Sequence, residues 1–579
     1  MSVKPKLYLN LYWHMHQPDY RDVLTGEFVL PWTYLHAIKD YTDMAYHLEA
    51  NPAACATFNF VPVLLDQLED YTRQFAEGKI RDPLLALLAA DNLDQITAVQ
   101  RQLIFESCFK SNHEKMLAPY AHYQQLLTVF KALVTQGEEV LDYLSGQYLA
   151  DLLVWFHLSW TGESVRRSST LVKGLMEKGH SYSLQDRQAL FKLIGKLITE
   201  LIPRYKKLQD SGRIEISTTP HYHPILPLLL DFDCVRDAMP DAPLPVHPQY
   251  PGGTSRAKAH IESAQKSHLQ RFDQAASGMW PAEGGVSHAA LMLMAKHGIS
   301  WAATGEGVLT NSLRKQSGEE NLPPRQEYLY KPYLITDSTH EIIGFFRDDN
   351  LSDKIGFDYA KWLATDAVKD FVAELERIHK NSNPEEHAVV SVILDGENAW
   401  EYYPYNGYYF LSELYEALAG HPHIELTTFS EITGRLKTKP SKKSKKIGLG
   451  TLTTISAGSW VYGSFSTWIG SPDKNRGWDL LCEAKKSYDQ IVQEGILNKA
   501  EIAAAERQLS ICEGSDWFWW FGDYNPSHSV ESFDRLYRRN LTNLYHLLKL
   551  PMPDELNQPI SKGHGHPAAG GTMRRGSEE

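Results

Sequence analysis

Two acidic residues stand where a pair of carboxylates could act on one bond. Glu283 lies in Gly278-Met-Trp-Pro-Ala-Glu-Gly-Gly-Val-Ser-His288, whose glycines and proline exclude a helix interior or a central strand. Asp395 directly follows residues 388–394, the most β-rich run in the chain. Glycoside cleavage needs one ionised and one protonated carboxyl beside the scissile bond. Each acid has a tryptophan nearby, which suits a sugar, although Glu397 and Glu401 compete with Asp395 for its role.

Polar residues also follow two other predicted strands. Residues 7–13 form an apolar, aromatic run that ends at His14, His16 and Gln17. Residues 214–217 alternate apolar and polar side chains and are followed by His221 and His223. In β/α barrels, the carboxyl ends of the strands carry the active site. These histidines are candidates for that site, with an ordinary structural role as the alternative.

Strands and helices alternate along most of the chain. Strands are predicted at 7–13, 56–65, 214–217, 299–304, 342–346 and 388–394, and helices at 256–274, 362–380, 478–494 and 499–512. Apolar residues three and four apart predict a helical stretch at about 84–208. This order predicts an α/β fold with a parallel β/α barrel in preference to an open sheet. No glycine-rich phosphate loop follows a strand, so nucleotide binding is not expected.

The chain divides into four predicted parts. Residues 1–436 form a catalytic barrel that includes the helical insertion, and residues 437–450 form a basic linker or loop. Residues 451–550 form a C-terminal helical domain, and residues 551–579 a disordered tail. Aromatic clusters at 459–470 and 513–523 are either a domain interface or a wall that stacks on sugars.

Composition narrows the classes of partner and compartment. The 579 residues carry a net charge of −13, which argues against nucleic acid or an anionic membrane as partner. The five cysteines are far apart and form no Cys-x-x-Cys, so neither a disulfide framework nor a thiolate metal site is expected. No signal peptide and no membrane-spanning run is recognisable, which predicts a cytoplasmic protein.

Five ordered segments resemble the motifs of glycoside hydrolase family 57. They are His14-Met-His-Gln-Pro18, Glu215-Ile-Ser-Thr-Thr-Pro-His-Tyr-His-Pro224, Trp280-Pro-Ala-Glu-Gly-Gly-Val-Ser287, Asp395-Gly-Glu-Asn-Ala-Trp-Glu-Tyr-Tyr403 and Leu426-Thr-Thr-Phe-Ser-Glu431. The segment Glu513-Gly-Ser-Asp-Trp-Phe-Trp-Trp520 is similar to the helical region that follows the barrel in that family. The residues in these motifs are most similar to those of the amylopullulanase and α-amylase branch of the family. That branch has serines where this chain has Ala282 and Gly285, so the choice between α-1,4 and α-1,6 linkages stays open.

The resemblance implies a retaining enzyme on an α-glucan or maltooligosaccharide, with an incomplete (β/α)7 barrel and a helical bundle. It implies Glu283 as nucleophile, Asp395 as general acid/base, and neither a cofactor nor a metal. The candidates for substrate binding are His14, His16, Gln17, Glu215, His221, His223, Trp280, Arg347, Asp348, Glu397, Trp400, Trp460, Trp468, Asp516 and Trp517.

Three alternatives remain open at the level of sequence. The same fold could carry an α-glucan transferase or a branching enzyme. The paired histidines, with Asp348 or Asp353, could bind Zn²⁺ as in metal-dependent deacetylases and mannosidases. A carbohydrate-binding protein without catalysis would keep the tryptophans but would not need Glu283 together with Asp395.

Overall fold

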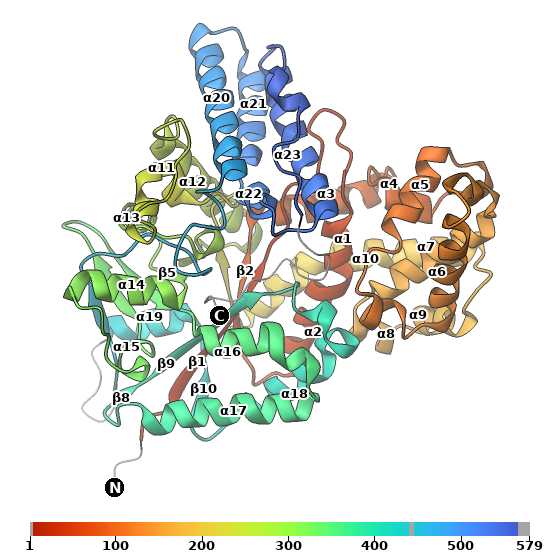
Figure 1. The fold of residues 1–579 in the computed structure, drawn as a ribbon. Coiled ribbons are helices and arrows are strands. Elements are labelled where there is room, and N and C mark those ends of the chain that lie inside the picture. Colours follow the sequence, from red (N-terminus) through yellow and green to blue (C-terminus); the bar gives the residue numbers. More distant parts are fainter. Residues whose placement is uncertain (1–3, 439–444, 565–579) are drawn as a thin grey trace.

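The computed structural model describes residues 4–438 and 445–564, and its centre is a curled sheet of mostly parallel strands (Figure 1). The barrel strands are β1 (Leu7–Met15), β2 (Ala56–Phe60), β3 (Ile214–Thr218), β4 (Gly278–Met279), β5 (Trp301–Thr304), β7 (Glu341–Phe346) and β9 (Val389–Asp395). Strand β1 pairs with β9 over residues 8–14 and with β2 over residues 12–15. These parallel pairings confirm the predicted fold class.

The barrel is incomplete between β7 and β9. These strands are joined by an isolated bridge between Arg347 and Ser391, and the Asp348 amide donates to the Ser391 carbonyl at 2.8 Å. The shorter strands are β6 (Tyr333–Thr336), β8 (Glu386–His387), β10 (Ile424–Leu426), β11 (Lys446–Ile447) and β12 (Gly450–Leu452). Of these, β6 runs antiparallel to β7, and β10 pairs with residues 7–9 of β1. The barrel therefore closes at one point instead of along a full ladder.

The period of two along β1 separates the helix-facing core from the barrel interior. Leu9, Leu11 and Trp13 belong to the large core cluster that includes the surrounding helices. Tyr8 and Tyr12 belong instead to a second cluster inside the barrel, with Trp280 and other residues of the neighbouring strands. Continuing this alternation places His14 on the interior side at the carboxyl end of β1. Aromatic side chains thus fill the barrel interior below the polar side chains, such as His14, at the carboxyl ends of the strands.

Helices surround the barrel on most sides. They are α1 (Trp32–His36), α2 (Thr42–Ala50), α3 (Pro62–Glu77), α11 (Leu226–Leu230), α12 (Gly253–Phe272), α13 (His288–Lys296), α14 (Glu306–Ser317), α15 (Arg325–Tyr328), α16 (Asp349–Asp353), α17 (Ala364–Asn381), α18 (Tyr408–Leu418) and α19 (Phe429–Lys437). The strand predicted at 56–65 is wrong after Phe60. Pro62 begins α3 instead, because proline lacks the amide hydrogen that a strand needs and suits the first turn of a helix.

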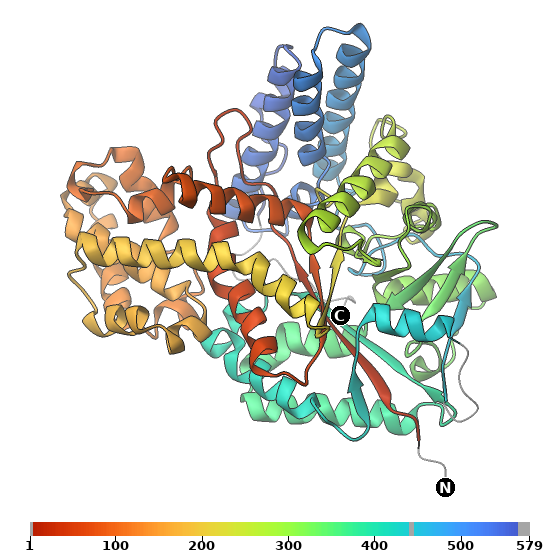
Figure 2. The ribbon, with the colours of Figure 1, turned by 180° about the vertical axis from the view of Figure 1, so that it is seen from behind.

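The insertion between α3 and β3 is helical, and it projects from one side of the barrel (Figure 1). Its helices are α4 (Pro83–Leu88), α5 (Ala98–Ser107), α6 (Ala121–Val134), α7 (Gly146–Ser159), α8 (Glu163–Ser168), α9 (Thr170–Lys178) and α10 (Leu184–Asp210). Helix α10 is the long element that leads from the insertion back to the barrel (Figure 2). Among the described residues, no helix has both the length and the apolar character that a bilayer crossing requires.

The C-terminal region is a group of helices beside the barrel (Figure 1). They are α20 (Pro472–Glu494), α21 (Lys499–Cys512), α22 (Asp516–Trp520) and α23 (Ser527–Leu547). Of the expected linker, residues 439–444 lie outside the described residues, as do residues 565–579 of the expected tail. The remainder of that tail includes the buried side chains Leu556 and Ile560. The boundaries of the domains stay predictions.

A buried charge cluster ties the C-terminal region to α12 of the barrel. The Glu513 carboxylate is fully buried and accepts hydrogen bonds from Arg256 Nε at 2.8 Å and from Tyr250 Oη at 2.6 Å. His260 Nε2 lies 2.7 Å from its other oxygen. Burial alone would raise the pKa of Glu513, but the Arg256 charge and the His260 hydrogen bond outweigh it and lower the pKa to about 2. The carboxylate is therefore ionised at neutral pH.

We expect Glu513→Gln to lower the free energy of unfolding by about 3–5 kcal/mol, because it leaves the buried Arg256 guanidinium without its counter-charge. Denaturant unfolding at pH 7 measures this loss. Glu531→Gln is the matched control, since Glu531 forms an exposed ion pair with Arg535 and should change stability by less than about 1 kcal/mol. The effect should also depend on pH. A carboxylate with a lowered pKa stabilises the fold fully above its usual value of 4.5, and this contribution is lost as pH falls toward 2. A loss as small as that of the control would contradict the assigned role of the cluster.

Candidate active site

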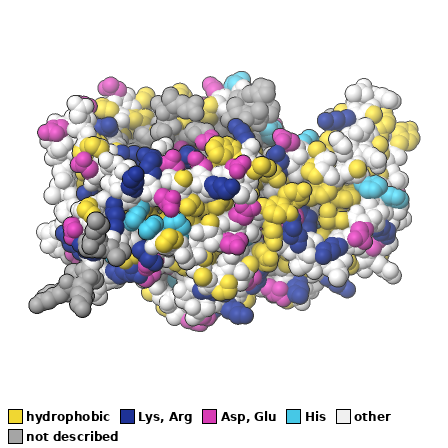
Figure 3. Space-filling view, turned by 90° about the horizontal axis from the view of Figure 1, so that it is seen from below, with side chains coloured by type: hydrophobic (Ala, Val, Ile, Leu, Met, Phe, Trp, Pro, Cys, Tyr) yellow, Lys and Arg dark blue, Asp and Glu magenta, His cyan; other side chains and the backbone are white. Residues whose placement is uncertain are grey.

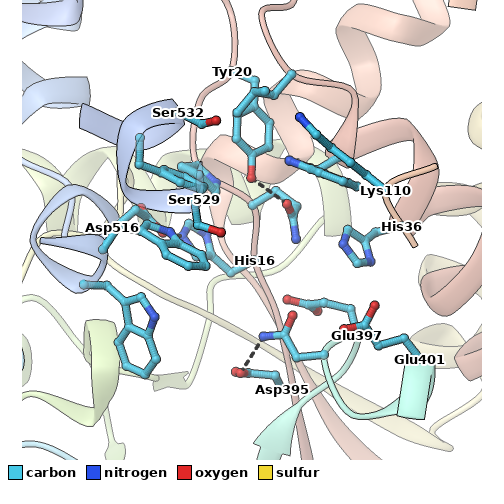
Figure 4. Close-up of a pocket in the computed structure, with 18 of the residues that line it drawn as sticks. His16, Tyr20, His36, Lys110, Asp395, Glu397, Glu401, Asp516, Ser529 and Ser532 are labelled. Carbon is cyan, nitrogen blue, oxygen red and sulfur yellow. Dashed lines mark hydrogen bonds and ion pairs between the residues drawn. The ribbon is translucent and has the colours of Figure 1, made fainter. Parts of the chain in front are cut away.

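A cavity of about 670 Å³ lies at the carboxyl ends of the barrel strands and is walled by three parts of the chain (Figure 4). The barrel contributes His14, His16, Gln17, His223, Glu283, Asp395, Glu397 and Asn398. The insertion contributes residues 109–113 and Trp160, and the C-terminal region contributes Trp460, Asp516, Trp519, Trp520 and Phe533. The predicted pair of acids therefore shares one cavity, although the two residues are more than a hundred positions apart in the sequence.

Glu283 occupies a strained turn that follows β4. Its φ of +58° is a left-handed conformation that non-glycine residues adopt rarely and that is often found at functional sites. The backbone of the turn is fixed on both sides, because Trp460 N donates to the Glu283 carbonyl at 3.1 Å and Trp280 N donates to the Thr218 carbonyl at 2.8 Å. Ser515 Oγ lies 2.8 Å from Glu283 Oε1. The turn thus directs a carboxyl into the cavity, and the C-terminal region supplies its hydrogen-bond partner.

Burial and neighbouring acids keep a proton on Glu283. Loss of hydration is the largest cause, and the Asp516 and Asp395 charges add to it, while Ser515 opposes it. Together they raise the pKa of Glu283 to about 8. A carboxyl with this pKa is mostly protonated at neutral pH.

Asp395 ends β9 and is the second acid of the cavity. Asn398 Nδ2 donates to its Oδ2 at 2.9 Å. Burial raises the pKa of Asp395 to about 6, although the Asn398 hydrogen bond and the electrostatic interactions with His16 and Arg347 oppose the rise. The adjacent Glu397 has a pKa raised well above its usual value, because it is buried and lies close to Asp395 and Asp40. The cavity thus holds several carboxyls that compete for protons near neutral pH.

A chain of hydrogen bonds connects Glu283 with the barrel interior. Asn59 Oδ1 can only accept, so His14 Nδ1 donates to it across 2.7 Å. His14 Nε2 lies 3.2 Å from His223 Nε2, and His223 Nδ1 lies 2.9 Å from Ser515 Oγ. Burial lowers the pKa of His14 to about 3 and that of His223 well below its usual range, so both rings are neutral. The single hydroxyl proton of Ser515 can be given to His223 or to Glu283, which couples the protonation of the two residues.

A second contact joins the C-terminal region to β1. His16 Nε2 lies 2.8 Å from Asp516 Oδ1, and the His16 and His223 rings stack with centroids 3.9 Å apart. Among the described residues, His16, His223 and Asp516 are the group whose ligand atoms lie close enough for a metal ion. The lone pair of an imidazole nitrogen lies in the ring plane, and these planes differ by only 20°. Stacked rings direct their lone pairs side by side, so the geometry does not favour one ion bound by both.

Several residues predicted to bind substrate do not line the cavity. Glu215 faces the barrel interior nearer the amino end of β3, where it accepts from Ser430 N at 2.8 Å and from the Trp301 indole at 2.9 Å. Trp280 is fully buried in the interior, in contact with Tyr12, so it supports the site from behind.

Other tryptophans and polar residues from the prediction are also structural. The indole of Trp400 donates to the Gly396 carbonyl, and the ring packs on Trp13. The buried residues Trp468 and Trp517 belong to the large core cluster. His221 is held outside the cavity between Asp66 and Ser263, and Asp348 caps α16 and bonds Arg325. Arg347 is paired with Asp349 and Asp353. It lies over the ring of Trp460, which lines the cavity, and its charge lowers the pKa of Asp395.

Sequence reasoning missed most of the outer wall of the cavity. The residues on the insertion side include Trp32, Lys110, His113 and Trp160. No motif marks these positions, because the insertion is recognisable only by its helical periodicity. Trp519 and Trp520 lie in an aromatic cluster that the sequence did single out, and Ser515 precedes them in the same segment.

We expect two substitutions to move the pKa of Glu283 in opposite directions from about 8. Asp516→Asn removes a negative charge and should lower it, while an amide oxygen can still bond His16. Ser515→Ala removes the hydrogen bond to the ionised carboxylate and should raise it. Infrared titration of the protein with isotope-labelled glutamate measures the protonated carboxyl band, and Glu283→Gln identifies the band. Shifts of the same sign in both variants would contradict this account.

Comparison with known proteins gives a consistent result. A family model described as glycosyl hydrolase family 57 matches residues 10–443. No curated protein sequence matches the chain. Three crystal structures are similar in fold. A branching enzyme of that family from Thermococcus kodakaraensis, in complex with glucose, is 15% identical with a TM-score of 0.56, over 93% of this chain and 90% of that one.

The second structure is the α-amylase AmyC from Thermotoga maritima, which is 13% identical with a TM-score of 0.53, over 95% of this chain and 96% of that one. The third is a branching enzyme from Pyrococcus horikoshii, which is 15% identical with a TM-score of 0.53, over 96% of both chains. At these identities the likeness concerns the fold.

Proposed function

Because the chain belongs to glycosyl hydrolase family 57, we propose that it is a retaining glycoside hydrolase that acts on α-glucans. The observation that carries the proposal is the pair of carboxyls in one cavity, the buried Glu283 after β4 and the half-buried Asp395 at the end of β9. Both have raised pKa values that bracket neutral pH. A pair of this kind can hold one proton between them, as double displacement requires.

The reaction proceeds in two displacements. Glu283 attacks the anomeric carbon while Asp395 protonates the glycosidic oxygen, which leaves with the shortened chain. The resulting glucosyl ester on Glu283 is then attacked by water, and Asp395 takes the proton of that water. The free acids and the released sugar complete the cycle.

The proton must lie on Asp395 when the reaction begins. In the free protein it lies mainly on Glu283, whose pKa is the higher of the two. The anomeric carbon gains positive charge in the transition state, which favours an ionised Glu283, and Ser515 can then donate to that carboxylate. Substrate and Ser515 together thus shift the proton toward Asp395.

The walls of the cavity suit a chain of neutral sugars. Trp160 of the insertion, Trp32 of α1, and Trp519 and Trp520 of the C-terminal region line it. Aromatic rings offer apolar faces to the C–H faces of sugars, and the polar groups between them can bond hydroxyls. The amylopullulanase and α-amylase type remains the proposed branch, with α-1,4 linkages as substrate and α-1,6 linkages as a further candidate.

A transferase on the same cavity is the second candidate. Aromatic residues on both sides of the acids could hold an acceptor sugar that competes with water for the glucosyl ester. The similar structures include branching enzymes as well as an amylase. Product analysis on amylose, pullulan and short maltodextrins separates hydrolysis from transfer, because only transfer yields products longer than the substrate.

Two other classes have less support. A zinc-dependent deacetylase or mannosidase would need Asp348 or Asp353 beside the histidines, but these acids pair with Arg325 and Arg347. A binding protein without catalysis would have no need to bury two carboxyls in a shared cavity, where each loses hydration.

We expect Glu283→Gln and Asp395→Asn each to lower kcat/KM on maltooligosaccharides by about a thousandfold. Azide should restore turnover in the two alanine variants, and the glycosyl azides that they form should differ in anomeric configuration. In Asp395→Ala it replaces water and gives a retained glycosyl azide, and in Glu283→Ala it replaces the nucleophile and gives an inverted one. Glu397→Ala is the comparison, because Glu397 is the nearest competing acid. Azide rescue in Glu397→Ala but not in Asp395→Ala would move the acid role to Glu397.

We expect kcat/KM to follow a bell-shaped pH profile with limbs near 6 and 8. Below the lower value both carboxyls are protonated, so no nucleophile is present. Above the upper value both are ionised, so no acid is present. The lower pKa of Glu283 in Asp516→Asn should move the basic limb to lower pH. Initial rates on a soluble maltooligosaccharide measure the profile. A range from about pH 4 to about pH 10 extends about two pH units beyond each limb. A basic limb that does not move in this variant would contradict the assignment.

A further inference from the structure

Three tyrosines are exposed within a short segment beside the cavity. The exposed fractions are 39% for Tyr402, 57% for Tyr405 and 44% for Tyr409. Most large aromatic side chains of the chain are buried, so this concentration is unusual. On the face shown in Figure 3, hydrophobic side chains gather between the barrel and the insertion.

The backbone holds this segment in a strained conformation. Tyr405 and Asn406 have φ values of +55° and +54°, which non-glycine residues rarely adopt. The Asn406 side chain is buried, where it accepts from Lys39 Nζ at 2.9 Å and donates to Asp43 at 2.9 Å. Gly407 follows with its own positive φ, and a Cβ there would lie 2.8 Å from the Trp400 ring. The turn is thus anchored from inside while the Tyr405 ring remains outside.

Arg167 of the insertion holds the tyrosine rings together. Its guanidinium carbon lies 4.9 Å from the centroid of the Tyr409 ring and 6.0 Å from that of Tyr405. Its Nη2 donates to Tyr409 Oη at 2.9 Å, and its Nε donates to Glu163 at 2.8 Å. Rings fixed in this way lose little conformational freedom when a ligand stacks on them.

We infer that Tyr405 and Tyr409, whose rings meet edge to face at 85° with centroids 5.6 Å apart, form an exposed aromatic corner, here called the platform, that binds a chain of α-glucan outside the catalytic cavity, an inference that rests on the proposed function. Tyr402 connects the two, because its ring lines the cavity and is also exposed. A glucan long enough to leave the cavity past Tyr402 reaches Tyr405 three residues further on. Short maltooligosaccharides that fill the cavity do not extend to the platform.

The chemistry of the platform fits a neutral sugar. Tyrosine rings offer apolar faces for the C–H face of a pyranose, and the hydroxyls of Tyr405 and Tyr409 can bond those of the sugar. Glu163 pairs with both Arg167 and Arg166, and Arg167 also donates to the Tyr409 hydroxyl, so its guanidinium is engaged by groups of the protein. The ligand class is therefore a long, uncharged α-glucan such as glycogen or amylopectin.

The test separates binding from turnover. Native gels that contain glycogen measure the Kd of the inactive Glu283→Gln protein, with and without Tyr405→Ala and Tyr409→Ala. Removal of both rings should raise the Kd about tenfold, or about 1.4 kcal/mol. Tyr143→Ala is the matched control, since Tyr143 is 87% exposed on the insertion and should leave the Kd unchanged. With the catalytic residues intact, the double variant should lose efficiency on glycogen and keep kcat and KM on maltotetraose.

Each other outcome overturns the inference. An unchanged Kd for glycogen would contradict the platform. An equal loss of catalytic efficiency on glycogen and maltotetraose would also contradict it, because the effect would then belong to the cavity. If the double variant instead loses self-association in sedimentation experiments while glycogen binding stays, the surface is a contact between copies of this chain. The proposed function fails separately. This is the case if removal of the two rings weakens glycogen binding as expected, but the unsubstituted protein turns over no α-glucan.

Discussion

The site depends on the buried ion pair between Glu513 and Arg256. An ionised carboxylate can remain in the interior only if charges and hydrogen bonds replace its hydration, and Arg256, His260 and Tyr250 supply them. Ser515 follows Glu513 by two residues, and its amide donates to the His223 carbonyl at 2.9 Å. The cluster therefore sets the position of the only hydroxyl that the described structure places on Glu283, and of Asp516 beside His16. The barrel without this region would have the two acids but would lack Ser515 and Asp516, which adjust the pKa of Glu283.

Burial then has opposite consequences for different groups in the cavity. It raises the pKa of Glu283 and Asp395 and lowers the pKa of His14 and His223, so each of these groups is driven toward its neutral form. In the proposed mechanism Glu283 must be ionised to attack, so hydrogen bonding must offset part of this effect. Ser515 contributes a donor to Glu283, and Asn398 contributes one to Asp395. The balance of desolvation against these donors places both acids near the pH at which one proton is shared.

Much of the fold could be predicted from the sequence, because its signal is local. The apolar runs of β1 and β9, the helical spacing in the insertion and the proline and glycines around Glu283 each report on neighbouring residues. The same holds for Asp395, which follows a recognisable strand. The family prediction is confirmed by the match over residues 10–443.

The remainder depends on contacts between distant segments, which no local pattern encodes. Glu215 has the same inward orientation as Ser217, but its layer lies deeper in the barrel, where it meets Ser430. Trp280 and Trp460 are both tryptophans beside Glu283, yet only Trp460 lines the cavity. Ser515 contacts Glu283 from 232 residues away. These distinctions require the three-dimensional arrangement of the barrel and the C-terminal region.

The two departures from the expected motif around Glu283 have a structural reason. A Cβ on Gly285 would lie 2.9 Å from the Ala282 carbonyl oxygen and 3.2 Å from a methyl group of Ile225, so the turn leaves no room for serine without a shift. Ala282 is buried, and neither residue lines the cavity. Both positions therefore affect the packing of the turn. Contacts with the substrate are expected from the residues in the walls of the cavity. Those walls come from the insertion and the C-terminal region, so the preference among α-glucan linkages is expected to reside in Trp160, Trp519 and their neighbours.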